Sequence, residues 1–240
     1  MPSYGAGQGL EIANEMLNRR RFLIGLTGLA VAGCASEGST PDLVAQTITQ
    51  KPRRKSGYPL TAEQIDEIPY ATLGVSVGGA PGAVMVLSTI TGTELRWVSA
   101  DRVIFVTDHG RLLRTQGLKR DLLATRWVDA SGADPLVEIL KGGPLPPPAV
   151  YRRIDLAHEN EHDVQVESRF EDGGAETIRI LGVEHETRRI DEIADMPAWR
   201  WRVRNRFWID PRDGRVWRSV QQYCPEIPPL RLETLKPAAL

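Results

Sequence analysis

The sequence has very few cysteines: Cys34 and Cys224 are the only two among its 240 residues. Cys34 stands in a segment typical of lipid attachment, described below, so Cys224 has no partner for a disulfide within the chain. We therefore expect packing, without an internal disulfide, to stabilise the fold. We also expect Cys224 to be a small buried apolar residue and not a reactive thiol.

The sequence also lacks a large excess of either charge. Its 30 basic and 31 acidic residues give a formal net charge of −1, which is not the basic balance typical of a nucleic-acid-binding domain. A Gly-rich phosphate loop, a serine nucleophile elbow and a cysteine-rich metal site are missing as well. We therefore expect no nucleic acid, no cofactor and no metal, and no residue stands out as catalytic.

Long hydrophobic runs are absent too. The apolar run Phe22–Ala32 is far shorter than the roughly 20 residues that a membrane-spanning helix requires. It follows Arg19–Arg21, and Val31–Gly33 supplies small residues directly before Cys34, which is the order found in a bacterial lipoprotein signal. Small residues let the signal peptidase bind the backbone closely, and only a thiol accepts the lipid. We predict cleavage between Gly33 and Cys34 and acylation of Cys34.

The lipid on Cys34 predicts where the protein is held. A lipoprotein carries two or more hydrocarbon chains, and each buried methylene contributes about 0.8 kcal/mol to membrane binding. The next residue is Ala35, whereas an aspartate there would favour retention at the inner membrane. We therefore expect an anchor in outer-membrane lipid, at the periplasmic face.

Two export routes fit the segment before the apolar run. Arg19 and Arg20, within Asn18–Leu23, resemble the twin-arginine motif. An arginine-rich signal for general secretion fits equally well. Met16 directly precedes this pattern, so the sequence is consistent with a start at Met1 or at Met16.

The remaining chain is long enough for one sizeable domain with its own core. We divide the sequence into a signal peptide at residues 1–33, a lipid-anchored tether at 34–60 and a single β-rich domain at 61–240. A flexible tether of this length spans about 25–30 Å, so the domain can stand away from the bilayer.

The first part of the domain consists of short segments rich in β-branched residues. It follows a short helix that begins with the capping-box pattern Thr61–Gln64, and turn signals such as Thr91–Thr93 and Asp108–Gly110 separate its apolar segments. The expected strands are Thr72–Gly78, Ala83–Ile90, Glu94–Val98, Arg102–Thr107 and Arg111–Thr115. Their tight connections predict a mainly β fold, an antiparallel meander with one or two short helices, the second at Asp134–Leu140.

Strand patterns return in the last third of the chain. Val164–Phe170 alternates apolar and polar residues, Glu171–Gly174 has the composition of a turn, and apolar residues follow at Ile178 and Ile180. This order predicts a hairpin. A further strand is expected at Trp199–Ile209, followed by a turn and another strand.

Arginine occupies every second position of the strand expected at Trp199–Ile209. Residues on one face of a strand repeat about every 6.6 Å, so four side chains are expected to form a positive row: Arg200, Arg202, Arg204 and Arg206. Such a row can bind an acidic polysaccharide or an acidic partner, because guanidinium groups bind carboxylates in bidentate fashion. The alternative, which we favour, is a solvated sheet face whose arginines pair with acids on neighbouring strands. Candidates for such pairing are Glu184, Glu186 and Asp191.

The segment His158–His162 matches the pattern H-E-x-x-H. In zinc proteases the two histidines lie one helical turn apart and bind the metal, and the glutamate, here Glu159, acts as general base. That chemistry requires a helix. The surroundings here are polar and a strand pattern begins at Val164, so a polar surface turn is the expected structure.

Motifs spread over residues 60–237 resemble those of one family. They are Ile68–Ala71, Leu95–Asp101, Gly110–Leu118, Asp134–Leu136, Asn205–Asp210 with its continuation to Gln221, and Leu235–Pro237. In these stretches the chain resembles the YjbF/GfcB family of capsule and exopolysaccharide lipoproteins. The resemblance implies a mainly antiparallel β domain curled into an open half-barrel. It brings no catalytic residues with it.

The resemblance also implies a role in producing or exporting a surface polysaccharide, beside an outer-membrane export protein. Our leading hypothesis is a non-catalytic outer-membrane lipoprotein with a binding or scaffold role. A periplasmic hydrolase acting on the glycan is an alternative, because two of the 31 acids are enough for glycoside hydrolysis. A zinc peptidase at His158 and His162 is a less favoured alternative.

Overall fold

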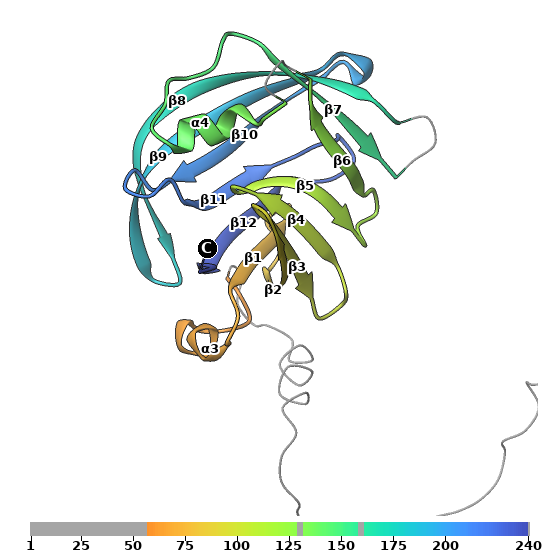
Figure 1. Cartoon of the computed structure of the whole chain (residues 1–240). Helices are drawn as coiled ribbons and strands as arrows, with labels where there is room; N and C mark the ends of the chain where they lie inside the picture. Colours follow the sequence, from red (N-terminus) through yellow and green to blue (C-terminus); the bar gives the residue numbers. More distant parts are fainter. Residues whose placement is uncertain (1–56, 129–131, 158–160, 240) are drawn as a thin grey trace, which may run out of the picture. The chain divides into compact units, whose positions relative to one another are not determined.

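The computed structural model describes residues 57–128, 132–157 and 161–239, which fall within one compact unit. These residues form twelve strands and two short α-helices (Figure 1). The strands are β1 (Thr72–Val77), β2 (Ala83–Thr91), β3 (Glu94–Ser99), β4 (Ile104–Asp108), β5 (Arg111–Gln116), β6 (Leu122–Trp127), β7 (Val150–Leu156), β8 (Val164–Ile180), β9 (Val183–Met196), β10 (Trp201–Ile209), β11 (Val216–Gln221) and β12 (Leu230–Lys236). The helices are α3 (Ala62–Glu67) and α4 (Pro135–Leu140), and a 3₁₀ turn spans Pro197–Trp199.

All twelve strands belong to one antiparallel sheet that curls back on itself. Its order is β5-β4-β3-β2-β1-β12-β11-β10-β9-β8-β7-β6, so the first and last strands of the described domain pair with each other. The two ends of this order, β5 and β6, are consecutive in the chain and lie together. The predictions of a mainly β fold, of an antiparallel meander and of a barrel-like sheet that does not fully close are confirmed.

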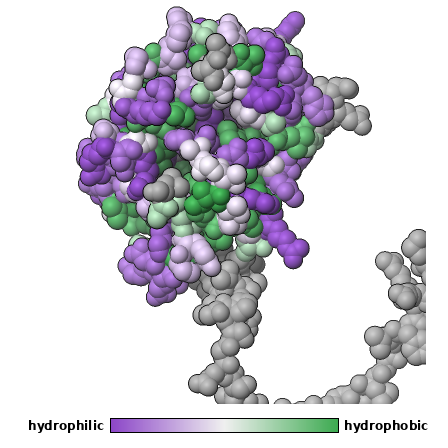
Figure 2. All heavy atoms as spheres, in the orientation of Figure 1, coloured by the Kyte–Doolittle hydropathy of each residue, from purple (hydrophilic) through white to green (hydrophobic). Residues whose placement is uncertain are grey.

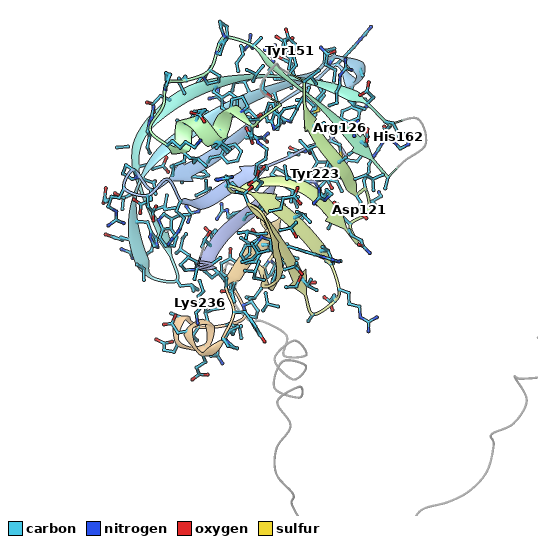
Figure 3. All side chains as sticks on the ribbon, viewed as in Figure 1. Asp121, Arg126, Tyr151, His162, Tyr223 and Lys236 are labelled. Carbon is cyan, nitrogen blue, oxygen red and sulfur yellow. The ribbon has the colours of Figure 1, made fainter. Side chains whose placement is uncertain are left out.

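A seam between β5 and β6 is what keeps the sheet from closing. Side chains bridge it in place of a backbone ladder: the amide of Leu122 donates to Thr115 Oγ1 over 2.9 Å, and Thr125 Oγ1 donates to the carbonyl of Leu113 over 3.1 Å. Asp121 holds the connecting turn, because its carboxylate accepts the amide of Gly117 over 2.9 Å (Figure 3). The seam is therefore fixed by local polar contacts.

The concave side of the sheet contains the main core. Alternate residues of strands from both halves of the sheet meet there, as expected for a sheet with one buried face. Members of this core are Leu73, Met85, Trp97, Phe105, Leu156, Val166, Leu230 and Leu232. A second cluster packs Leu136 and Ile139 of α4 against Ile190 of β9 and Phe207 of β10, and Figure 1 shows α4 inside the curve of these strands.

Both predicted helices are present, and both begin at a side-chain cap. At α3 the amide of Gln64 donates to Thr61 Oγ1 and the amide of Thr61 donates to Gln64 Oε1, which is the expected capping box. At α4 the carboxylate of Asp134 accepts the amide of Leu136 over 2.9 Å. No helix among the described residues is long and apolar enough to cross a membrane.

The predicted turn at Glu171–Gly174 is wrong. β8 runs through it without interruption, and the chain reverses only at Leu181 and Gly182, both with positive φ. Residues Asp172 to Gly174 form a bulge opposite β9: Gly174 takes a φ of +79°, and its amide donates to Asp172 Oδ1 over 2.9 Å. Aspartate and glycine favour a β-bulge as readily as a turn.

The tip of the long β8–β9 hairpin packs against the convex side of the sheet. Ile178 and Ile180 join Trp208 of β10 in a third apolar cluster. The His185 ring lies 4.0 Å from the ring of Trp217 between centroids. Elsewhere on the exterior, hydrophobic residues are interspersed among hydrophilic ones on the face shown in Figure 2.

Candidate functional site

Four charged side chains lie inside the curled sheet and form a buried charge network: Arg111, Asp134, Arg152 and Glu192. They come from β5, the cap of α4, β7 and β9, and none is more than 8% exposed. Arg111 Nη1 donates to Glu192 Oε2 over 2.9 Å and Arg111 Nε donates to Asp134, while Arg152 Nη1 donates to Glu192. Two positive and two negative groups thus neutralise each other.

Neutral side chains complete the hydrogen bonding of Glu192. Ser168 Oγ donates to Glu192 Oε1 over 2.8 Å, and Asn205 Nδ2 donates to Glu192 Oε2 over 2.9 Å. Burial by itself raises the pKa of Glu192, but the charges of Arg111 and Arg152 outweigh it and hold that pKa far below its usual range. A carboxyl group held this strongly in its charged form cannot donate a proton near neutral pH, so Glu192 does not suit a general acid.

Aromatic rings enclose the arginines of the network. The guanidinium carbons of Arg111 and Arg152 lie 5.2 and 5.3 Å from the centre of the Trp127 ring, and Arg111 also lies 5.0 Å from the Phe207 ring. Cation–π contacts of this kind gain strength when they are shielded from water. The network therefore links β5 to β7 and β9, which lie in the other half of the sheet, and to the cap of α4.

Gln221 of β11 makes a second connection to β5 across the interior. Its Oε1 accepts the amide of Leu112 over 3.0 Å, and its Nε2 donates to the carbonyl of Gly110 over 2.8 Å. These strands are not neighbours in the sheet. Gly110 has a φ of +83°, and a Cβ there would lie 2.6 Å from Cβ of Val216 on β11. Glycine is therefore needed both for the turn and for the approach of β5 to β11.

A cavity of about 390 Å³ lies beside this contact, at the end of the sheet where β1 begins and β12 ends. Its apolar lining comes from the main core and from β11: Leu73, Leu95, Trp97, Val216 and Leu232. Pro237 and Ala238, just after β12, also line it. Lys236 joins this end of β12 to α3, since its Nζ donates to the carbonyls of Asp66 and Ile68 over 2.9 and 2.6 Å (Figure 3).

The charged side chains of the lining, His109, Asp213 and Arg215, are partly exposed and form a polar rim, and each belongs to an ion pair. His109 Nδ1 lies 2.6 Å from Asp108 Oδ1, and this hydrogen bond raises the pKa of His109 and lowers the pKa of Asp108. Arg215 Nη2 lies 3.7 Å from Asp213 Oδ2, and its guanidinium lies 5.3 Å from the ring centre of Trp217. The rim is therefore polar, with its opposite charges paired.

The predicted arginine row is shorter than expected. Arg200 follows the 3₁₀ turn with a φ of +50° and lies outside β10, so its place in the row is wrong. Arg202 Nε donates to Asp195 on β9 over 2.7 Å, and Arg204 Nη1 donates to Asp191, also on β9, over 2.8 Å. Arg206 is exposed on the same strand.

Of the acids considered as partners for this row, Asp191 takes that role. Glu184 instead pairs with Arg179, and Glu186 accepts the hydroxyl of Thr177. Adjacent strands thus hold Arg202 and Arg204 through ion pairs. Binding of an acidic polymer or partner by Arg200, Arg202, Arg204 and Arg206 stays a prediction.

The H-E-x-x-H match lies in the connection between β7 and β8. His158 and Glu159 are outside the described residues, and His162 lies just before β8 (Figure 3). The carbonyl of Glu161 accepts the amide of Leu156 over 2.9 Å, a contact that links the two strand ends, and its carboxylate pairs with Arg120. Within the described part of the chain, no three histidine, cysteine or acidic side chains gather as a metal site.

The predicted lipid-attachment and export residues lie outside the described residues. These are Arg19, Arg20, Gly33 and Cys34. Cys224 is described and fully buried, as expected, and burial raises the pKa of its thiol to about 11. A buried thiol with a raised pKa is a poor nucleophile.

Comparisons with known proteins identify a family and two curated relatives. The model of the family described as "Group 4 capsule polysaccharide lipoprotein gfcB, YjbF" matches residues 45–235. The uncharacterized lipoprotein GfcB of Escherichia coli K12 is 29% identical over 226 residues, covering 91% of this chain and 99% of its own. The uncharacterized lipoprotein YjbF of the same organism is 28% identical over 194 residues, covering 76% of this chain and 82% of its own.

A solved structure shares the fold. The crystal structure of the hypothetical lipoprotein YmcC from Escherichia coli K12 superposes with a TM-score of 0.67 at 27% sequence identity, covering 86% of this chain and 100% of that one. The family match includes the strands that supply the buried charge network and nearly all of the domain around it. The chain therefore belongs to the GfcB/YjbF family of group 4 capsule polysaccharide lipoproteins.

Proposed function

We propose that this protein is a lipid-anchored accessory to the production or export of a surface polysaccharide, with a binding or scaffold role and without catalysis. In this proposal the protein lies at the periplasmic face of the outer membrane, where an acyl group on Cys34 holds it. Its partners are outer-membrane lipid, an outer-membrane exopolysaccharide export protein and the acidic polysaccharide itself. Membership of the capsule polysaccharide lipoprotein family supports the pathway.

The buried charge network is the observation that carries the non-catalytic role. Its acids are engaged with arginines, and the lowered pKa of Glu192 keeps that carboxyl group charged. Glycoside hydrolysis requires two carboxyl groups, one of which must give up a proton. Among the described residues that line the cavity, Asp213 is the one acid. The geometry thus supports a rigid scaffold better than a hydrolase.

Co-purification from the native membrane tests the scaffold role most directly. The acylated protein, extracted in mild detergent, should bring down an outer-membrane export protein, and its deletion should reduce polysaccharide at the cell surface. The Cys34→Ala chain should leave the membrane fraction and fail to restore secretion. Normal secretion by Cys34→Ala, with no lipid on the protein, would contradict the anchored role.

A turnover assay separates the scaffold from the alternative of a glycan hydrolase. The purified protein is incubated with the purified polymer, and polymer length is followed by size-exclusion chromatography. We expect the length to stay unchanged over many hours. Shortening of the polymer by the wild-type chain would favour the hydrolase.

A further inference from the structure

We propose that the cavity between β1, β3, β11 and β12 binds one fatty-acyl chain. This site goes beyond the proposed accessory role and does not depend on it. The cavity has about 390 Å³, whereas an apolar cavity of roughly 150 Å³ is enough to bind benzene. The cavity thus has between two and three times the volume that binds benzene, which is enough for much of one hydrocarbon chain.

The lining of the cavity matches a hydrocarbon ligand. Leucine side chains from three strands, Leu73, Leu95 and Leu232, line it together with Trp97 and Val216. Each of these side chains lies on the concave face or at its margin, where it continues the main core. Apolar surface placed against such a wall leaves water, and the burial contributes roughly 25 cal/mol per Å².

The hydroxyl groups of Thr107, Ser219 and Thr234, all in the lining, form hydrogen bonds within the protein. Thr107 Oγ1 accepts the indole N–H of Trp97 over 2.9 Å, and Thr234 Oγ1 donates to the carbonyl of Val216 over 3.0 Å. A sugar in this space would bury hydroxyl groups, and each one left without a hydrogen bond costs free energy. An acyl chain has no such groups, so the same wall favours it.

The rim suits the polar end of an amphiphile. Paired charges of His109 with Asp108 and of Arg215 with Asp213 stand at the opening. A headgroup or carboxylate can remain hydrated beside these pairs while its chain enters between the strands. The ligand class is therefore an amphiphile with one linear chain in the cavity.

Two variants should close the cavity without disturbing the sheet. Leu95→Trp adds volume from β3, where Leu95 is partly buried against the core. Ala238→Trp adds it from the segment after β12, which carries no ladder. The matched control is Ala175→Trp, because Ala175 is exposed on β8 and is not among the residues that line the cavity.

The experiment measures saturable binding of cis-parinaric acid, a fluorescent straight-chain fatty acid, to the full Cys34→Ser chain and to the three variants made in it. We expect one bound probe per chain, displacement by palmitate but not by a soluble oligosaccharide, at least tenfold weaker binding in both filled variants, and unchanged binding in Ala175→Trp. Thermal unfolding checks that the filled variants fold, and filling an apolar cavity should keep or raise their midpoint. Absence of saturable binding, or equal binding by both folded filled variants, would overturn the proposal.

A second arm identifies the source of the chain. The same titration is made on the acylated wild-type protein and on the Cys34→Ser chain, both in the same detergent at the same concentration, because detergent chains can also enter the cavity. Probe binding only to the Cys34→Ser chain would show that the protein's own anchor occupies the cavity, and equal binding to both would assign it to a separate membrane lipid. Either result supports an acyl-chain site, because in both cases the Cys34→Ser chain binds the probe and its filled variants bind it more weakly.

Discussion

Arg111 on β5 and Glu192 on β9 form an ion pair inside the curled sheet, although 81 residues separate them in the chain. The strands that carry them are not neighbours in the sheet. This pair, with Asp134 and Arg152, therefore holds the two halves together where the backbone ladder between β5 and β6 is missing. A rigid interior of this kind supports a scaffold role, because it holds the outer surfaces of the two halves of the sheet in fixed positions relative to each other.

Replacing Glu192 with glutamine should destabilise the fold strongly. The change leaves Arg111 and Arg152 buried with Asp134 as their remaining acid, and breaking a buried ion pair by removing one partner costs about 3–5 kcal/mol. Denaturant unfolding monitored by tryptophan fluorescence measures the loss. The matched control is Glu184→Gln, which removes an exposed ion pair with Arg179 and should change the stability little. Equal effects of the two substitutions would contradict a structural role for the network.

Acidification should destabilise the protein through the same residue. The folded pKa of Glu192 is depressed, so its ion pairs stabilise the fold above the unfolded pKa of about 4.3 and lose that contribution as pH falls towards the folded value. We expect the free energy of unfolding to drop as pH decreases below about 5. A pH series of denaturant melts tests this: the drop should be smaller in Glu192→Gln than in the wild type, and an identical pH profile would sink the explanation.

Most of the sheet could be predicted from the sequence because local signals agree there. β1 to β5 are short, include many β-branched residues and have strong turn residues between them, such as Gly92 and Gly110. The capping residues Thr61 and Asp134 likewise mark both helices. In these segments the chain's local preferences and its packing point to the same structure.

β9 escaped prediction because charged residues occupy both of its faces. Arg189 and Asp191 lie on one face of it, where they pair with Glu176 and Arg204, while Glu192 lies on the other face between Ile190 and Ala194. A charge on the buried face breaks the apolar alternation that marks a strand. The partner of Glu192 is distant in the chain, and short-range patterns carry no information about it. The buried charge network was missed for this reason, although the cap Asp134 was within a predicted helix.

Gly110→Ala should be more damaging than the same change at another turn glycine. Gly110 and Gly92 both have positive φ, +83° and +59°, so both variants carry backbone strain. At Gly110 the new methyl group also meets Val216, whereas nothing lies within 4 Å at Gly92. We expect Gly110→Ala to cost about 1–3 kcal/mol more than Gly92→Ala, the usual range for an overpacked site. Thermal and denaturant unfolding of both variants measure the difference, and equal losses would show that β11 moves away freely.

Reversing two charges on β10 tests the arginine row as a binding surface. Arg202→Glu with Arg206→Glu alters exposed side chains on one strand face, so the fold should persist while the local field changes sign. If the row binds acidic polymer or partner, affinity should fall at least tenfold at low salt, and the wild-type affinity should decrease with added salt because screening weakens exposed charge pairs. Arg179→Glu with Arg231→Glu makes the same change in net charge at exposed sites on other strands and should bind nearly as the wild type does. Equal binding by the two double variants would contradict a binding surface on β10. The role of Arg202 and Arg204 would then be limited to their ion pairs with Asp195 and Asp191.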